Sequence, residues 1–261
     1  MVTFAANLTM LFTEAPFMDR FRLAKEAGFS YVEYLFPYDF KAEDIKAELE
    51  QNGLKQVLFN IPSGNWGQGD RGIASHPNRV DEFRAGVHQA LNYALVLGVS
   101  RLNCQPGKLV AGCSEADQWS TLADNVRYAA GVLQERGINL LLEPLNPFDI
   151  PGVLISRTEQ AVRLIEELAL PNVFLQYDVY HAQRVEGELV STLRKYRSLI
   201  RHIQIADNPG RHQPGTGEIN YPYILKEIDA LGYEGYIGLE YVPAGGAKES
   251  LRWIKEFGYE L

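Results

Sequence analysis

The chain has 261 residues, 46% of them hydrophobic, and a formal net charge of −8 at pH 7. This length is close to the roughly 250 residues of one β/α barrel, and no linker-like stretch divides it, so we expect a single domain over residues 1–261. The acidic balance disfavours nucleic acid as a partner, and no apolar run of about 18 residues predicts a membrane span.

The amino-terminal sequence and the cysteines indicate where the chain resides. The first residues lack the basic region and apolar core of a secretory signal. Cys104 and Cys113 fit no metal-binding spacing and need no disulfide. We therefore expect a cytoplasmic protein that acts on a small molecule, and the sequence leaves a homo-oligomer open.

Taken in order, short apolar runs alternate with amphipathic segments. The predicted strands are residues 3–7, 31–35, 56–60, 100–104, 138–143, 173–178, 200–207 and 236–240. The predicted helices are residues 16–28, 41–51, 83–94, 114–133, 156–168, 189–196, 224–228 and 251–257. Eight strands alternating with eight helices predict an α/β protein with one (β/α)8 TIM barrel.

One segment interrupts this alternation. Residues 62–77 contain four glycines, together with Trp66, Asp70 and Arg71. Such a density of Gly and Pro predicts irregular structure, and a long loop in a compact domain is usually a lid or a binding loop.

Polar side chains stand at or near the ends of the last four predicted strands. They are Glu143, Asp178, Gln204 and Glu240, separated by 35, 26 and 36 residues. One β/α unit takes roughly 30 residues, so these side chains should meet at the carboxyl-terminal mouth of the barrel, where such folds carry their chemistry. Any one of them alone is better explained as a helix cap or a loop residue, but four in succession favour a common site.

Carboxylates that meet at low dielectric repel one another, and a divalent cation would relieve the repulsion. Three carboxylates and one amide oxygen, from Glu143, Asp178, Gln204 and Glu240, favour a hard ion, Mg²⁺ or Mn²⁺, over Zn²⁺. The sum of charges would still repel an anionic substrate. A substrate carboxylate would therefore need a cationic partner, for which Arg71 and Arg211 are the candidates; the alternative for each is a solvated surface arginine.

Two histidines lie close to these positions in the sequence. His181 follows Asp178 by three residues, and we favour a hydrogen bond from it to a substrate oxygen over a structural role. His202 shares a strand face with Gln204. A site role and a buried, hydrogen-bonded core role are equally open for it.

Together these residues form motifs that resemble a known family. The motifs are residues 143–146 (EPLN), 178–181 (DVYH), 202–207 (HIQIAD), 238–241 (GLEY), 69–72 (GDRG) and 209–221 (PGRHQPGTGEINY). They resemble the xylose-isomerase-like TIM barrels, and among these the hydroxypyruvate isomerases, over nearly the whole chain. The resemblance implies a divalent metal held at Glu143, Asp178, Gln204 and Glu240, with the two glutamates also acting as proton donor and acceptor.

The implied reaction interconverts hydroxypyruvate and 2-hydroxy-3-oxopropanoate (tartronate semialdehyde) by proton transfer through an enediolate. Glu240 is assigned as the base and Glu143 as its partner acid, with their order open. Alternatives on the same scaffold are a 2-oxo-tetronate isomerase and a ketose 3-epimerase; relatives of the latter usually carry His at the position of Gln204. An abasic-site endonuclease would need more histidine ligands than the five histidines supply, and a non-catalytic sugar-binding barrel would not need both glutamates.

Overall fold

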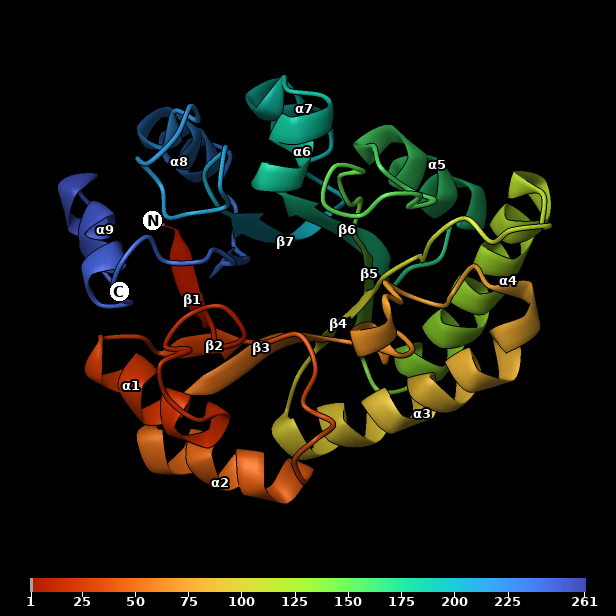
Figure 1. Cartoon of the computed structure of the whole chain (residues 1–261), viewed down its shortest axis with the longest axis horizontal. Coiled ribbons are helices and arrows are strands. Elements are labelled where there is room, and N and C mark those ends of the chain that lie inside the picture. Colours follow the sequence, from red (N-terminus) through yellow and green to blue (C-terminus); the bar gives the residue numbers. More distant parts are fainter. Residues whose placement is uncertain (1) are drawn as a thin grey trace.

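The computed structural model describes residues 2–261 and shows eight parallel strands closed into a barrel (Figure 1). Each strand pairs with the next along the chain, and β8 pairs with β1. The strands are β1 (Thr3–Asn7), β2 (Tyr31–Glu33), β3 (Lys55–Asn60), β4 (Arg101–Cys104), β5 (Asn139–Leu142), β6 (Val173–Asp178), β7 (Ile200–Ile205) and β8 (Tyr236–Leu239). The barrel that the strand spacing predicts is thereby confirmed.

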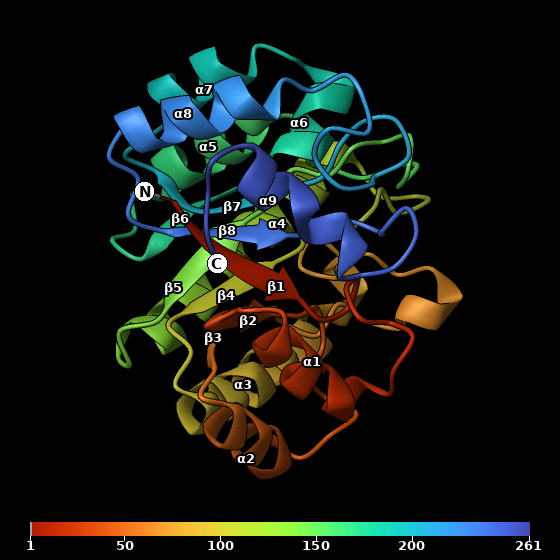
Figure 2. The same cartoon turned by 90° about the vertical axis from the view of Figure 1, so that its left-hand side faces the viewer.

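The helices surround the strands. They are α1 (Arg20–Glu26), α2 (Ala42–Asn52), α3 (Val80–Leu97), α4 (Glu115–Gln134), α5 (Thr158–Leu168), α6 (Val179–Val185), α7 (Leu189–Lys195), α8 (Tyr221–Ala230) and α9 (Arg252–Glu256). Figure 2 shows α1, α2 and α3 on one side of the strands and α5, α7 and α8 on the other. Among residues 2–261, no helix is long and apolar enough to cross a membrane.

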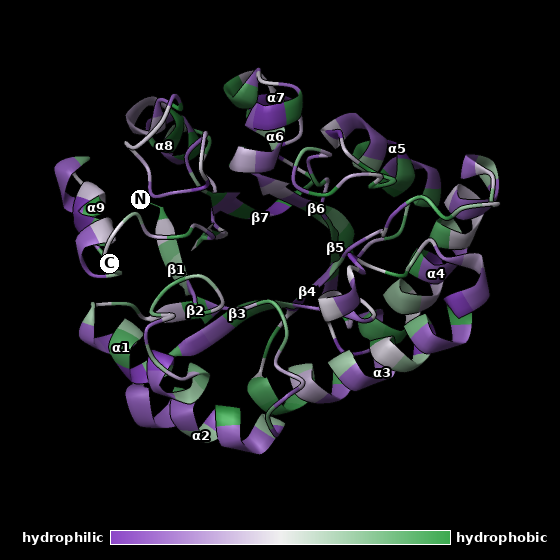
Figure 3. Cartoon of the chain, viewed as in Figure 1, coloured by the Kyte–Doolittle hydropathy of each residue, from purple (hydrophilic) through white to green (hydrophobic). Residues whose placement is uncertain are grey.

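The main apolar core lies between the strands and the helix layer. In α4, Leu122, Val126, Ala129 and Leu133 are all buried at the helical spacing expected from the sequence. The hydropathy colouring alternates along α3 and α4 accordingly (Figure 3). Ser114 caps α4 by accepting a hydrogen bond from the Asp117 backbone N–H at 3.0 Å.

A second, small apolar cluster fills the barrel interior toward the amino-terminal ends of the strands. Ala5 of β1 and Leu141 of β5 belong to it, and Tyr31, Phe174 and Tyr236 pack against it. Because β1 and β5 lie on opposite sides of the ring, their contact places this cluster inside the barrel. It fills the part of the barrel interior near the amino-terminal strand ends with apolar side chains.

The connection after β6 differs from the expectation. The sequence predicts one helix near residues 189–196, whereas the structure also has α6, so nine α-helices are present in residues 2–261. This helix of seven residues is too short for its periodicity to be recognised, and it begins directly at Asp178, the last residue of a strand.

Two other helices begin later than predicted. A 3₁₀ turn at Phe17–Asp19 precedes α1. The first residue of α5 is Thr158, because the Gln160 side chain accepts the backbone N–H groups of Ser156 at 2.9 Å and Arg157 at 3.0 Å.

The long loop at residues 62–77 is anchored at both ends. Asp70 accepts the Asn65 N–H at 2.7 Å and pairs with Arg79 at 2.7 Å. Gly72, at φ +104°, lies against the backbone of the β4–α4 connection, where an added Cβ would come within 2.2 Å of the Gln105 carbonyl oxygen. Whether this loop acts as a lid stays a prediction.

Candidate active site

The four polar strand ends lie at one mouth of the barrel. Glu143 directly follows β5, Asp178 ends β6, Gln204 is in β7, and Glu240 directly follows β8. Each is at most 4% exposed. Asp178 pairs in register with Gln204, which places these two side chains at one level of the barrel. Gln204 pairs with Gly238, so Glu240 lies two residues further along the chain, toward the mouth.

Asp178 uses its two carboxylate oxygens differently. Oδ1 caps α6 by accepting the backbone N–H groups of Tyr180 at 2.8 Å and His181 at 3.2 Å. Oδ2 is buried without a hydrogen-bond partner, 3.6 Å from both His181 Nε2 and Arg211 Nη2. The helix cap and the candidate ligand, which were alternatives from sequence, are therefore two atoms of one side chain.

His181 is held in one neutral tautomer. Its Nδ1 accepts the Asn146 backbone N–H at 3.1 Å and lies 2.6 Å from the side-chain amide nitrogen of the same residue. Burial lowers the pKa of His181 to about 4, so the ring is neutral and carries its proton on Nε2. That N–H points toward Asp178 Oδ2 and the mouth, which suits a hydrogen-bond donor better than a metal ligand.

Arg211 is the cation among the acids. Its Nη2 lies 2.6 Å from Glu240 Oε2 and 3.6 Å from Asp178 Oδ2. Burial alone would lower the pKa of Arg211, but Glu240, Asp178 and Glu143 outweigh it and raise the pKa above its ordinary value. The guanidinium therefore stays charged and partly neutralises the mouth.

The pKa values of both glutamates are raised in the absence of a metal. Burial, and then the neighbouring Asp178, raise the pKa of Glu143 to about 8, although Asn103 Nδ2 donates to its Oε2 at 2.7 Å. Burial also raises the pKa of Glu240 well above its ordinary value, against the opposing effect of Arg211. One arginine does not neutralise three buried carboxylates.

A buried network fixes the orientation of Gln204. Its Nε2 donates to Glu33 Oε1 at 2.9 Å, and its Oε1 accepts from Gln176 Nε2 at 2.6 Å. His202 Nε2 lies 2.6 Å from Glu33 Oε2, and Asn7 Nδ2 donates to Glu33 at 2.9 Å. Because a carboxylate only accepts hydrogen bonds, Glu33 holds the nitrogen of the Gln204 amide and turns its oxygen away.

Sequence reasoning missed Glu33, which is fully buried at the last position of β2. The available signal was a charged residue in a strand otherwise suited to burial. Glycine at 238 is part of the same arrangement, because a Cβ there would lie 2.2 Å from Glu33 Oε1. For His202, the hydrogen bond to Glu33 is the buried core role that the sequence left open.

Arg71 lies apart from these acids. Its guanidinium stacks over the Trp66 ring at 4.0 Å and donates to the carbonyls of Trp66 at 3.1 Å and Asp70 at 2.6 Å. No ion pair joins it to a carboxylate within residues 2–261. Of the two candidate arginines, the structure brings only Arg211 to the acids.

The residues at the mouth fit a divalent cation. Carboxylate oxygens of Glu143 and Asp178 lie within 4.8 Å of each other and of a ring nitrogen of His181, and among residues 2–261 this cluster does not include Glu240. The unpartnered Asp178 Oδ2 and the raised pKa of Glu143 are what a missing positive charge produces.

The strands form a closed barrel, and its carboxyl-terminal mouth holds buried carboxylates, a neutral histidine and an arginine. These features define a (β/α)8-barrel enzyme with an acidic site for a small polar substrate. More narrowly, the chain belongs to the Xylose isomerase-like TIM barrel family, whose sequence model matches residues 21–257. The family expected from the motifs is thus confirmed.

Similar proteins cover nearly the full length of the chain. It is 47% identical over 257 residues to the hydroxypyruvate isomerase of Escherichia coli (strain K12), covering 98% of this chain and 100% of that protein. It is 43% identical to the 2-oxo-tetronate isomerase of Pectobacterium atrosepticum, covering 98% and 97%. A solved structure described as an AP endonuclease of family 2 from Brucella melitensis superposes with a TM-score of 0.95 at 45% identity, covering 98% and 99%.

Proposed function

We propose that this chain is an isomerase that interconverts hydroxypyruvate and 2-hydroxy-3-oxopropanoate, with a divalent metal in the acidic mouth. The observation that carries the proposal is the pair of buried glutamates, Glu143 and Glu240, whose pKa values are both raised and which flank Asp178 and Arg211. The identity to isomerases of short oxo acids supports the same reaction type.

Glu143 and Asp178, which belong to one cluster of possible ligands, would hold the metal together with the buried Gln204 and Glu240. Oxygen ligands favour Mg²⁺ or Mn²⁺. When bound, such an ion would supply positive charge that stabilises negative charge developing on the substrate. Glu33 contributes by holding the Gln204 amide with its nitrogen inward, so that the oxygen is the atom left to face the cation.

The two glutamates move the carbon-bound proton. In hydroxypyruvate, Glu240 removes a proton from the hydroxymethyl carbon next to the carbonyl, which gives an enediolate. Return of a proton to the former carbonyl carbon, with transfer of the hydroxyl proton between the two oxygens, completes the isomerisation. A carboxylate with a raised pKa is a stronger base than an exposed one, so burial suits both glutamates to this task.

Arg211 and His181 would orient the substrate. Arg211 is charged and 21% exposed at the mouth, so its guanidinium can bind a substrate carboxylate in addition to Glu240. The Nε2–H of His181 would donate to a substrate oxygen. Arg71 would approach the substrate only if the loop at residues 62–77 moved, and its contribution is therefore expected to be smaller.

The test is to follow hydroxypyruvate by NMR in D₂O, with Mg²⁺ or Mn²⁺ added after chelation. The chain should incorporate deuterium at carbon as the isomer appears, and Glu240→Gln should lower turnover by about 10²- to 10⁴-fold while substrate still binds. Glu166→Gln, on the exposed surface of α5, is the matched control. Turnover near the wild-type value in Glu240→Gln would remove Glu240 from the mechanism.

A second candidate substrate is 2-oxo-tetronate, favoured by the 43% identity to an isomerase of that acid. The chemistry is the same with one more carbon. Comparing kcat/KM for the two acids and for several ketoses decides between them, because one added carbon in a fitted pocket typically changes this ratio by about 10- to 200-fold.

Other classes have weaker support. A nuclease acting on abasic DNA would bind phosphate backbones against a net charge of −8. Within residues 2–261, the candidate metal cluster contains a single histidine, His181. Failure of the chain to shift an abasic duplex at low salt would agree with the isomerase. The free Cys104 and Cys113 fit a reducing cytoplasm, which we propose as its compartment.

A further inference from the structure

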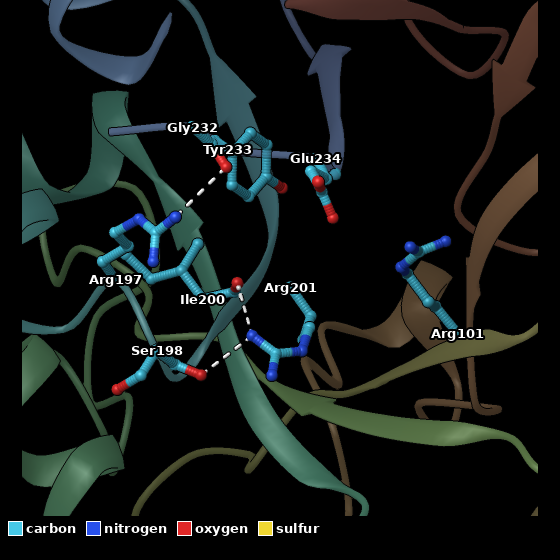
Figure 4. Close-up of a pocket in the computed structure, with 9 residues that line it drawn as sticks. Arg101, Arg197, Ser198, Ile200, Arg201, Gly232, Tyr233 and Glu234 are labelled. Carbon is cyan, nitrogen blue, oxygen red and sulfur yellow. Dashed lines mark hydrogen bonds between the residues drawn. The ribbon is translucent and has the colours of Figure 1, made fainter. Parts of the chain in front are cut away.

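A cavity of about 600 Å³ is lined by residues from the amino-terminal ends of β4 and β7 and from the loops before β7 and β8, opposite the acidic mouth. Figure 4 shows its lining side chains. Arg101 is the first residue of β4 and Arg201 the second residue of β7. Arg197, Tyr233 and Glu234 reach the cavity from the loops that precede β7 and β8. These are amino-terminal strand ends, so the cavity is separate from the candidate active site.

The three guanidinium groups around this cavity have no carboxylate partner. Arg197 donates to the backbone carbonyls of Leu231 and Gly232, and Arg201 Nη1 to those of Ser198 at 2.8 Å and Ile200 at 3.3 Å. Arg101 Nε is buried without a hydrogen-bond partner. Within residues 2–261, none of the three arginines forms an ion pair. Each guanidinium has five N–H donors, so most of these donors have no acceptor among the described residues.

Two of these arginines are held in place by aromatic rings. The Arg101 guanidinium lies 5.1 Å from the Tyr236 ring, and that of Arg201 lies 4.2 Å from the Phe174 ring. Both rings pack on the apolar cluster that fills the barrel interior near the amino-terminal strand ends. Stacking fixes the plane of a guanidinium and leaves its edge free, which is the arrangement that recognises an oxyanion.

The charge of this cavity is opposite to that of the whole chain. The chain has 33 acidic and 25 basic residues, yet the lining has three arginines and one carboxylate, the exposed Glu234. A neighbouring cavity of about 610 Å³ shares Arg101 and adds Lys55, together with Lys46 and Glu50, which form an ion pair at 3.7 Å. If these three arginines only closed the amino-terminal end of the barrel, they would be expected to pair with some of the surplus acidic residues, because unpaired like charges repel.

We propose that this cavity binds a small multivalent oxyanion, either a phosphate ester or a polycarboxylate. Guanidinium groups bind both through paired N–H···O bonds. The cavity volume lies in the range of about 300–1,000 Å³ typical of small-molecule sites.

Calorimetric titration of the metal-free, dialysed chain with pyrophosphate and with citrate tests the proposal. Arg101→Gln and Arg201→Gln should each weaken binding by about tenfold or more, since each removes charge-assisted hydrogen bonds to the anion. Glu234→Gln should tighten binding, because it removes the one opposing charge. Tighter binding of pyrophosphate indicates a phosphate ester, and tighter binding of citrate a polycarboxylate.

Arg211→Gln is the control for anions that bind at the active-site mouth, and it should retain the affinity of the wild type. Arg197 is exposed, so Arg197→Gln should fold and keep isomerase turnover while it loses anion affinity. This variant therefore tests the proposal even if Arg101→Gln is unstable. If neither pyrophosphate nor citrate binds, the proposal is overturned. Binding that disappears in Arg211→Gln and persists in Arg197→Gln and Arg201→Gln would also overturn it.

Discussion

At the scale of single residues, the orientation of the Gln204 amide depends on Glu33, a buried carboxylate that is not itself a candidate metal ligand. Glu33 accepts hydrogen bonds from Asn7, His202 and Gln204 and so decides which end of the Gln204 side chain is available. Partners of this kind usually affect metal affinity nearly as much as the ligands do.

Glu33→Gln should therefore weaken Mg²⁺ or Mn²⁺ binding by about 10- to 100-fold, the usual effect of losing a residue that orients a ligand. Its new amide group can donate as well as accept, so it no longer specifies the orientation of Gln204. Metal titration by calorimetry measures the change, and a circular dichroism melt shows that the variant is folded. Unchanged metal affinity in a folded variant would contradict the positioning role.

The contributions of Arg211 and Arg71 to substrate binding can be distinguished by varying the charge of the substrate. Arg211→Gln should raise KM for hydroxypyruvate by about 10- to 100-fold, corresponding to the loss of a charge-assisted hydrogen bond. It should change the kinetics of a neutral triose much less. Arg71→Gln, whose native side chain stacks on Trp66, is the comparison and should have a smaller effect. Equal losses for charged and neutral substrates would show that Arg211 does not bind the carboxylate.

At the scale of elements, the junction between β6 and α6 contributes both to the fold and to the candidate site. The last strand residue, Asp178, is also the N-cap of α6, and α6 carries His181 back over the mouth. The negative charge of Asp178 is also favourable at a helix N-terminus. A single side chain thus positions a helix and leaves Oδ2 for a cation.

Substitutions at Asp178 should separate these two roles. Asn retains a capping oxygen, so Asp178→Asn should keep the stability of the metal-free protein, whereas Asp178→Ala should lose about 0.5–2 kcal/mol. Both should lose metal binding. Ser114→Ala, which removes the cap of α4, is the matched control and should lose similar stability with metal affinity intact. Metal binding by Asp178→Asn at wild-type affinity would exclude Asp178 as a ligand.

At the scale of the whole molecule, the barrel stabilises an arrangement of charge that is unfavourable in the absence of a metal. Strand pairing brings Glu143, Asp178 and Glu240 together out of water, and Arg211 is the positive charge that lowers the pKa values of both glutamates against this repulsion. The energy that holds the acids together comes from the packing of strands and helices elsewhere in the chain.

The stability of the metal-free chain should therefore fall as pH rises. The pKa of Glu143 is about 8 in the folded chain against an ordinary 4.5, so the stability that this group contributes is complete below about pH 4.5 and is lost toward pH 8. Urea unfolding across this range measures the decline. Glu143→Gln should show a smaller decline, and added Mg²⁺ or Mn²⁺ should reduce it in the wild type. The same decline in Glu143→Gln would contradict the raised pKa.

The sequence by itself determined the barrel and the strand ends that carry its acids. Strand length, apolar runs and the spacing of Glu143, Asp178 and Glu240 are local properties, and a parallel barrel always brings carboxyl-terminal strand ends to one mouth. The cap of α4 is equally local and could be predicted from Ser114 and Asp117.

Only the tertiary structure decided which polar groups meet. Glu33 lies 171 residues from Gln204 in the sequence, and Arg211 lies 29 from Glu240, so neither contact has a local signature. The same holds for the three arginines at the opposite face, which come from separate strands and loops. The physical reason is that periodicity reports which side of an element is buried, whereas hydrogen bonds and ion pairs depend on distances that only barrel closure sets.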